Sequence, residues 1–292
     1  METELTKSVT LNNGVKMPRI GYGVYLIPSG MTERCVREAL RLGYRSIDTA
    51  QCYGNEREVG VAVRKSGLSR NEVFITTKLW GCSNYRDTLS SIDSSLRRLD
   101  LDYIDLLLIH EPTGDIPEIY KAMEDAYRVG KLRAIGVANF LDDAYLNLVE
   151  YAEIMPAINQ VETHVFRQQA SLRELMKLYG TQAEAWSPLA AGRDGFFTQP
   201  VLEEIARAHG KSVAQVGLRF LYQQNIIVIP KSTHIERMRE NKEIEDFMLT
   251  DEEMKRIMLL DRGKVCLTGG KPLILSRYAK RITSIQLLEH RV

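Results

Sequence analysis

The sequence lacks any long apolar run and any sizeable excess of one charge. None of its 292 residues lies in a stretch of 18 uninterrupted apolar positions, and the N-terminus METELTKSVT has no apolar core of the kind that a secretory signal needs. Lysine and arginine number 39 against 38 acidic residues, a net charge of +1. A protein that binds nucleic-acid phosphates usually carries a clear basic excess. We therefore expect a cytoplasmic protein that binds neither membranes nor nucleic acid.

Cysteine is also scarce. The four cysteines are Cys35, Cys52, Cys82 and Cys266. They are far apart and form no C-x-x-C pair, which disfavours both a zinc site and a disulfide framework. Cys52 lies beside Tyr53, so a redox-sensitive role stays open next to the simpler interpretation of a packed thiol. The four histidines other than His110 show no metal-ligand spacing, so the sequence predicts no metal site, and we expect those histidines at the surface or in loops.

Short apolar runs alternate with amphipathic stretches along most of the chain. Runs rich in β-branched residues predict strands, and apolar residues at three- and four-residue spacing predict helices. The expected strands are 19–23, 45–50, 72–78, 103–110, 131–139, 156–162, 181–187 and 225–232, and the expected helices are 32–43, 55–67, 85–100, 116–130, 142–153, 171–180 and 203–210. The repeat of about 30 residues is the length of one βα unit.

Eight strands that alternate with helices fit an α/β fold, the (β/α)8 TIM barrel of roughly 250 residues with extensions. A doubly wound open sheet is the alternative, but no G-x-G-x-x-G follows the first strand, and polar residues end many different strands. In the opening segment 8–20, Asn13 precedes Gly14 between short apolar runs, which predicts an N-terminal β-hairpin that caps the bottom of the barrel. We interpret 1–292 as one domain whose C-terminal extension, 262–292, is basic and holds a short helix over 277–288.

Polar residues stand where the expected strands end. Asp48, Lys78 and His110 each close an apolar run, and Tyr53 follows Asp48 by five residues. Four further strand ends carry Asn139, Gln160, Trp186 and Lys231. Any one of these residues could simply mark the end of a strand. Seven are hard to explain in that way, because the carboxyl ends of barrel strands meet at one mouth and desolvated polar groups without partners cost free energy.

The candidates at this mouth supply a carboxylate, a phenol, an ammonium and an imidazole, which together can protonate a carbonyl oxygen. A buried Asp48 holds Lys78 charged, and the ammonium favours a phenolate, so we expect the pKa of Tyr53 to be lowered. His110 can hydrogen-bond the substrate oxygen and orient it. The sequence shows no Ser or Cys paired with a base and no metal cluster, so the electrons must come from a cofactor.

The segments DTAQCYGNE, FITTKLW, LLLIH, GVANF, INQVE, AWSPLA and IPKSTHIERMRENKEI, in this order and spacing, resemble the aldo-keto reductases. The resemblance extends from about Val9 to Asp261. It implies NADPH-dependent reduction of aldehydes and ketones, including dicarbonyls and keto sugars, by a monomer whose partner is the small carbonyl substrate. The implied catalytic residues are Asp48, Tyr53, Lys78 and His110, with Tyr53 as the proton donor.

The resemblance also implies a site for NADP(H). Trp186 would stack on the nicotinamide, and Asn139 and Gln160 would hydrogen-bond its carboxamide. Lys231 ends an expected strand and Arg237 lies six residues on, so two cations and a helix N-terminus would surround the 2′-phosphate and favour NADP(H) over NAD(H). The remaining residues of the implied cofactor site are Val24, Tyr25, Ser187, Leu189, Ser232, Thr233, Glu240 and Asn241.

The implied substrate pocket consists of Tyr25, Trp80 and Glu111. Many relatives carry tryptophan directly after the catalytic histidine, where this chain has Glu111. Either Glu111 makes the pocket more polar or, as we expect, it points to solvent. Two other functions stay open, namely an NADP(H)-binding regulatory or structural barrel without turnover and a Schiff-base enzyme that uses Lys78 as its nucleophile.

Overall fold

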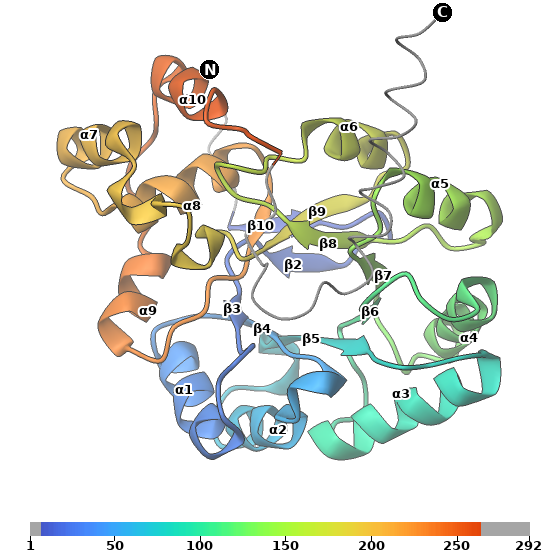
Figure 1. The fold of residues 1–292 in the computed structure, drawn as a ribbon. Coiled ribbons are helices and arrows are strands. Elements are labelled where there is room, and N and C mark those ends of the chain that lie inside the picture. Colours follow the sequence, from blue (N-terminus) through green and yellow to red (C-terminus); the bar gives the residue numbers. More distant parts are fainter. Residues whose placement is uncertain (1–6, 264–292) are drawn as a thin grey trace, which may run out of the picture.

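The computed structural model describes residues 7–263, and the expected helix over 277–288 lies outside them. Its main sheet has eight parallel strands, β3 to β10, and neighbouring strands follow one another in chain order. A parallel bridge between Ile20, just before β3, and Val228 in β10 closes the ring. The helices surround the strands (Figure 1). The (β/α)8 barrel is confirmed, and the open doubly wound sheet is wrong.

The elements follow the expected alternation. The barrel strands are β3 (Tyr22–Gly23), β4 (Ser46–Asp48), β5 (Phe74–Leu79), β6 (Leu106–Ile109), β7 (Ile135–Ala138), β8 (Ile158–Glu162), β9 (Gln182–Trp186) and β10 (Ile227–Val228). The helices are α1 (Ser29–Arg41), α2 (Glu56–Arg64), α3 (Tyr85–Leu99), α4 (Ile116–Arg128), α5 (Asp142–Tyr151), α6 (Ala170–Leu178), α7 (Pro200–His209), α8 (Val213–Gln223), α9 (Ile235–Lys242) and α10 (Asp251–Met258). Short 3-10 turns are η1 (Gln51–Tyr53), η2 (Arg70–Glu72), η3 (Ala190–Gly192) and η4 (Phe196–Thr198). The strands and helices that the sequence predicted within residues 7–263 are thus all present.

Two helices and one strand end differ from the expectation. The sequence did not predict α8, because it is buried on nearly every side, from Ala214 to Tyr222, and therefore shows no polar face. It also did not predict α10, a helix of only 8 residues that begins with a capping box. Strand β10 ends at Val228, so Lys231 lies in the following loop and does not end the strand. Pro230 has no N–H with which to continue the ladder.

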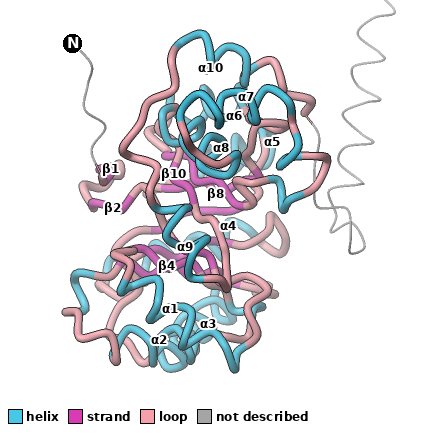
Figure 2. The backbone as a smooth tube through the Cα atoms, turned by 90° about the vertical axis from the view of Figure 1, so that its left-hand side faces the viewer, coloured by secondary structure: helices cyan, strands magenta, loops and turns pink. Residues whose placement is uncertain are grey.

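The predicted hairpin is present and caps one end of the barrel. Strands β1 (Ser8–Thr10) and β2 (Lys16–Pro18) pair antiparallel, and Gly14 turns between them with φ +84°. Met17 of β2 is fully buried against Phe74 and Leu106, which begin barrel strands. The hairpin therefore covers the amino-terminal ends of the strands, as expected, and lies outside the ring of helices (Figure 2).

Successive side chains of a barrel strand point alternately toward the helices and into the barrel, and apolar side chains line both sides. In β6, Leu107 and Ile109 pack in the large core beneath the helices, whereas Leu106 and Leu108 belong to the smaller cluster inside the barrel. Both faces of the parallel sheet are thus covered by apolar side chains. Within residues 7–263 no helix is both long enough and apolar enough to cross a membrane.

Candidate active site

The alternation of the strands places a polar layer inside the barrel, next to the mouth. In β5, Phe74 lies in the interior cluster and Thr77 faces α2, so Lys78 again faces inward. In β8, Ile158 lies in the interior cluster, and Gln160 is two residues further along the same face. Asp48, at the end of β4, joins them through the hydrogen bonds described next. The barrel interior is therefore apolar at the hairpin end and polar at the mouth.

A buried ion pair forms the centre of this layer. Lys78 Nζ lies 2.6 Å from Asp48 Oδ1 and also donates to the carbonyl oxygen of Thr49 at 2.9 Å. Neither side chain is more than 4% exposed. Burial alone would lower the pKa of Lys78, but the negative charge of Asp48 and its hydrogen bond to Lys78 oppose burial, and the pKa is raised. Lys78 is therefore a cation, as predicted from the sequence.

Glu184 is a member of this layer that the sequence reasoning missed. Gln160 Nε2 donates both to Asp48 Oδ2, at 2.8 Å, and to Glu184 Oε2, at 2.9 Å. Burial and the nearby charge of Asp48 raise the pKa of Glu184 well above its usual range, which keeps it neutral beside the ion pair. The signal was available, because Glu184 is two residues before Trp186 in β9 and so shares its inward face.

Tyr53 lies directly over the ion pair. It ends η1, the turn that follows β4, and Lys78 Nζ lies 5.1 Å from the centroid of its ring. The expected lowering of the Tyr53 pKa is wrong for this structure. Burial raises that pKa, and the opposing effect of Lys78 is smaller. The phenol is therefore held firmly in its protonated form.

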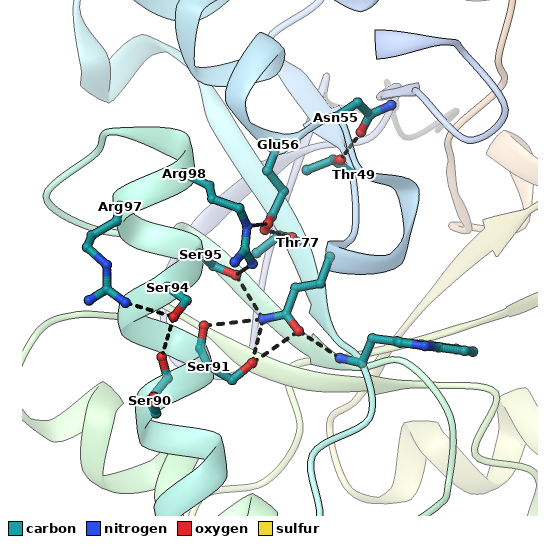
Figure 3. A network of polar contacts seen from close by, with 12 residues as sticks. Thr49, Asn55, Glu56, Thr77, Ser90, Ser91, Ser94, Ser95, Arg97 and Arg98 are labelled. Atoms are coloured by element: carbon teal, nitrogen blue, oxygen red, sulfur yellow. Dashed lines mark hydrogen bonds and ion pairs between the residues drawn. The ribbon is translucent and has the colours of Figure 1, made fainter.

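A network of polar contacts fixes the segment that carries Tyr53 (Figure 3). Thr49 and Asn55 flank η1, and the Thr49 hydroxyl donates to Asn55 Oδ1 at 2.7 Å. Glu56, at the start of α2, accepts from Thr77 of β5 at 2.7 Å and forms an ion pair with Arg98 of α3. Because these groups are buried or partly buried and paired on both sides, the turn has little freedom to move.

Gln51 ties the same turn to the next loop. Its amide donates to the hydroxyl oxygen of Ser91 in α3 at 2.8 Å, and its carbonyl oxygen accepts from the backbone N–H of Trp80 at 2.9 Å. Trp80 follows β5 directly. The positions of Tyr53 and Trp80 at the mouth are thus coupled through one side chain.

His110 follows β6 and contacts aromatic rings on two sides. Its ring centroid lies 5.7 Å from that of Tyr53 and 5.1 Å from that of Trp80, both edge to face. Cys52 Sγ lies 3.4 Å from its Nδ1. Burial, and then the charge of Lys78, lower the pKa of His110 to about 3. The imidazole is therefore neutral and can donate a single N–H to an oxygen at the mouth.

Asn139, Trp186 and Glu111 form a second hydrogen-bonded group at the mouth. Trp186 Nε1 donates to Asn139 Oδ1 at 2.8 Å. Asn139 Nδ2 donates to Glu111 Oε1 at 2.9 Å and to the carbonyl oxygen of His110 at 3.1 Å. The expectation that Glu111 points to solvent is wrong, because this bond turns its half-buried carboxyl toward the site. Burial raises the pKa of Glu111 to about 7, against the opposing hydrogen bond from Asn139.

The outer rim is more exposed. Tyr25 and Trp80 retain 49% and 44% of their accessible surface, and Tyr25 packs against Tyr53 with centroids 4.9 Å apart. Val24 is buried, and its backbone N–H donates to the carbonyl oxygen of Asp48 at 3.0 Å. The implied substrate walls therefore do lie beside the buried layer.

The residues expected at the 2′-phosphate lie together in the segment from β10 to α9. Lys231 and Arg237 are exposed, and within 7–263 neither forms an ion pair. Arg237 lies in the first turn of α9, which begins at Ile235. Ser232 accepts from the backbone N–H of His234 at 3.1 Å. The other expected residues here are Thr233, half-buried, Glu240, which accepts from Ser212, and Asn241, buried.

Two residues beyond Trp186 complete the expected set. Ser187 and Leu189 are half-buried in the loop after β9, and Ser187 adopts φ +49°. Among the remaining histidines, His164 lies in the loop after β8, which is one of the two expected positions, and it is fully buried beside Glu162. The part of the chain that the structure describes holds no group of three or more side chains that could bind a metal ion.

Known proteins resemble this chain over most of its length. The chain is 45% identical over 267 residues to glyoxal reductase of Bacillus subtilis, covering 90% of this chain and 96% of that protein. It is 42% identical over 270 residues to morphine 6-dehydrogenase of Pseudomonas putida, covering 87% and 91%. It superposes with a TM-score of 0.85 on the Bombyx mori aldo-keto reductase in complex with NADP, at 32% identity, covering 90% and 95%.

A protein-family model matches the sequence over most of the barrel. The model described as "Aldo/keto reductase family" matches residues 27–262. That range includes the ion pair of Asp48 and Lys78, both hydrogen-bonded groups at the mouth and helix α9. Together with the confirmed barrel and the relatives above, this match shows that the chain belongs to the aldo/keto reductase family.

Proposed function

We propose that this protein reduces aldehydes and ketones to alcohols with NADPH, and that it oxidises alcohols in the reverse direction. The proposed substrates are small carbonyl compounds, including dicarbonyls and keto sugars. The observation that carries the proposal is the buried Lys78–Asp48 ion pair beneath Tyr53, with the neutral His110 beside them. The reductase names of similar proteins support the same reaction class.

In this mechanism Tyr53 donates the proton. Its raised pKa keeps the phenol protonated until a carbonyl oxygen gains negative charge. The phenolate that remains then faces the ammonium of Lys78, which Asp48 holds in its charged form. His110, as a neutral donor, orients the carbonyl oxygen toward Tyr53. The proton thus moves from Tyr53 Oη to the substrate oxygen, and the ion pair below it stabilises the charge left behind.

The mouth fits a nicotinamide. Both N–H bonds of the Gln160 amide are used by Asp48 and Glu184, so its carbonyl oxygen is left to accept from a carboxamide. Asn139 lies beside Gln160, because its backbone N–H donates to the backbone carbonyl oxygen of Gln160 at 2.9 Å. Trp186, fixed by its N–H bond to Asn139, offers a flat face for stacking. When bound there, the nicotinamide supplies the hydride that the side chains cannot supply.

The segment after β10 fits the 2′-phosphate of NADP(H). Lys231 and Arg237 are exposed cations without ion-pair partners among the described residues, and Arg237 lies in the first turn of α9. Two cations near a helix N-terminus suit a phosphate dianion. The proposed contacts along the rest of the cofactor are Val24, Tyr25, Ser187, Leu189, Ser232, Thr233, Glu240 and Asn241. The NADP complex of a structural relative supports this assignment.

The other two functions receive less support. A Schiff-base nucleophile must be a neutral amine, whereas Lys78 is bonded to Asp48 and Thr49 and its pKa is raised. A barrel that binds NADP(H) without turnover would not need the complete set of Asp48, Tyr53, Lys78 and His110 in contact. Borohydride trapping of a substrate on Lys78 would revive the first alternative.

The test is an assay of the purified protein with NADPH and a panel of aldehydes, ketones and dicarbonyls, followed at the nicotinamide absorbance. We expect NADPH oxidation with several of them, and lower activity with NADH. Lys231→Ala combined with Arg237→Ala should raise the KM for NADPH at least about tenfold and that for NADH much less. Tight NADPH binding without oxidation by any carbonyl would favour the binding-only barrel instead.

A further inference from the structure

The acidic side chain of Glu111 lies on the rim of the mouth, where a hydrogen bond fixes its position. Glu111 follows His110 in the chain, and its Oε1 accepts from Asn139 Nδ2 at 2.9 Å. Two further hydrogen bonds fix Asn139: its Oδ1 accepts from Trp186 Nε1, and its Nδ2 also donates to the His110 carbonyl oxygen. The hydrogen bond therefore holds the carboxyl group against Asn139, on the side of the mouth that His110 and Trp186 share.

No cation neutralises this carboxyl group among residues 7–263. Glu111 takes part in no ion pair there, and its one hydrogen-bond donor is an uncharged amide. By contrast, the buried Asp105 at the opposite end of the barrel is paired with both Arg70 and Arg133. When it is ionised, Glu111 thus projects an uncompensated negative charge into the mouth.

The other side chains around the mouth carry no compensating charge. His110 is neutral, Trp80 packs against its ring at 5.1 Å, and the Cys52 thiol lies 3.4 Å from its Nδ1. The charge of Lys78 is already matched by Asp48 beneath Tyr53. The rim is thus largely aromatic with a single acidic group, and an electrostatic preference there depends mainly on Glu111.

We propose that Glu111 is a charge-selecting residue of the carbonyl site, which disfavours substrates that carry a carboxylate and favours neutral and cationic ones. This inference rests on the proposed carbonyl reduction and adds a substrate class to it. Two negative charges within several ångströms of each other in a partly desolvated site repel strongly enough to change a rate by about tenfold. The competing explanation is that Glu111 only orients Asn139.

The test compares three aldehydes of one shape and different charge: 4-carboxybenzaldehyde, its methyl ester and 4-(trimethylammonio)benzaldehyde. The value of kcat/KM is measured for each with the wild type, Glu111→Gln, Glu111→Lys and the control Glu118→Gln. Glu118 is exposed on α4, outside the mouth. Intrinsic reactivity of the aldehydes cancels when ratios of kcat/KM are compared between variants.

We expect Glu111→Gln, which keeps an acceptor for Asn139, to raise the ratio of the carboxylate to the ester at least about tenfold. Glu111→Lys should raise this ratio further and lower the ratio of the cation to the ester, while Glu118→Gln leaves both ratios unchanged. If the wild type reduces the ester but neither Glu111 variant shifts the ratios, charge selection is wrong and carbonyl reduction stands. If the wild type reduces none of the probes or the wider panel, carbonyl reduction itself is wrong.

Discussion

The inner layer and the outer rim of the mouth differ in how tightly the protein holds them. Asp48, Lys78 and Glu184 are buried, and each is bonded to another member of the inner layer or to Gln160. On the rim, Tyr25 and Trp80 keep almost half of their surface exposed. A change in the inner layer must therefore disturb folding and chemistry together. A change on the rim can alter the choice of substrate while the barrel stays intact.

The largest expected effect comes from breaking the inner ion pair. Lys78→Met should lower the free energy of unfolding by about 3–5 kcal/mol, because it leaves Asp48 buried without its cation. It should also abolish NADPH oxidation. Chemical denaturation followed by circular dichroism measures the first effect, and the nicotinamide assay measures the second.

An exposed ion pair provides the control for Lys78→Met. Arg256 of α10 and Glu204 of α7 are paired at 2.6 Å on the surface. Arg256→Met should lower the free energy of unfolding far less than Lys78→Met does, because solvent screens this pair. Equal losses of stability in the two variants would show that the inner layer is not held differently from the surface.

A second effect concerns pH and the neutral Glu184. Burial and Asp48 raise its pKa from 4.5 to about 8 in the folded protein. A group whose pKa is raised by folding contributes stability that is complete below its unfolded pKa and is lost as the pH rises through the folded one. The free energy of unfolding should therefore contain a component that falls between about pH 5 and pH 8, by at most about 1.4 kcal/mol per pH unit.

Glu184→Gln should remove that component. The amide has the same shape, stays neutral at every pH and can still accept from Gln160. Denaturation curves recorded across this pH range should be flatter for Glu184→Gln than for the wild type, with Glu118→Gln unchanged from the wild type. The same slope in all three proteins would mean that Glu184 is already ionised in the folded state.

The smallest expected effect is the pH dependence of selection at the rim. Burial raises the pKa of Glu111 to about 7, so its charge should appear as the pH rises through that value. The other groups at the rim do not titrate there, since the pKa of His110 is lowered to about 3, that of Cys52 is raised to about 11, and Lys78 stays charged. Glu184 of the inner layer, with a pKa of about 8, titrates in the wild type and in Glu111→Gln alike, so the difference between these two proteins reports on Glu111. Discrimination against 4-carboxybenzaldehyde should therefore grow up to about tenfold from pH 6 to pH 8, and Glu111→Gln should lack this trend.

The sequence predicted the barrel because each βα unit repeats the same local pattern. It also predicted the positions of Asp48, Lys78 and His110, because strand ends are readable from where apolar runs stop. Helix α8 was missed because burial on all sides removes helical periodicity. Strand β10 is shorter than predicted because Pro230 has no N–H with which to extend the ladder.

The electrostatics of the site were harder to predict than its positions. The charge of Lys78 alone predicts a lowered pKa for Tyr53. Burial has the larger, opposite effect on this pKa, and only the folded structure reveals how deeply Tyr53 is buried. The direction of Glu111 depends on a hydrogen bond from Asn139, 28 residues further along the chain. Glu184 was overlooked as a polar residue within a strand, although its alternation with Trp186 pointed inward.

The most direct test of the difference between the inner layer and the rim removes the hydroxyl oxygen from each of two neighbouring tyrosines. Tyr53 and Tyr25 have ring centroids only 4.9 Å apart, and one lies over Lys78 while the other is half exposed. Tyr53→Phe should lower kcat at least about a hundredfold and change the Kd for NADPH by less than about threefold, while Tyr25→Phe lowers kcat less than about tenfold. A Tyr53→Phe enzyme whose kcat stays within tenfold of the wild type would contradict the role of Tyr53 as proton donor.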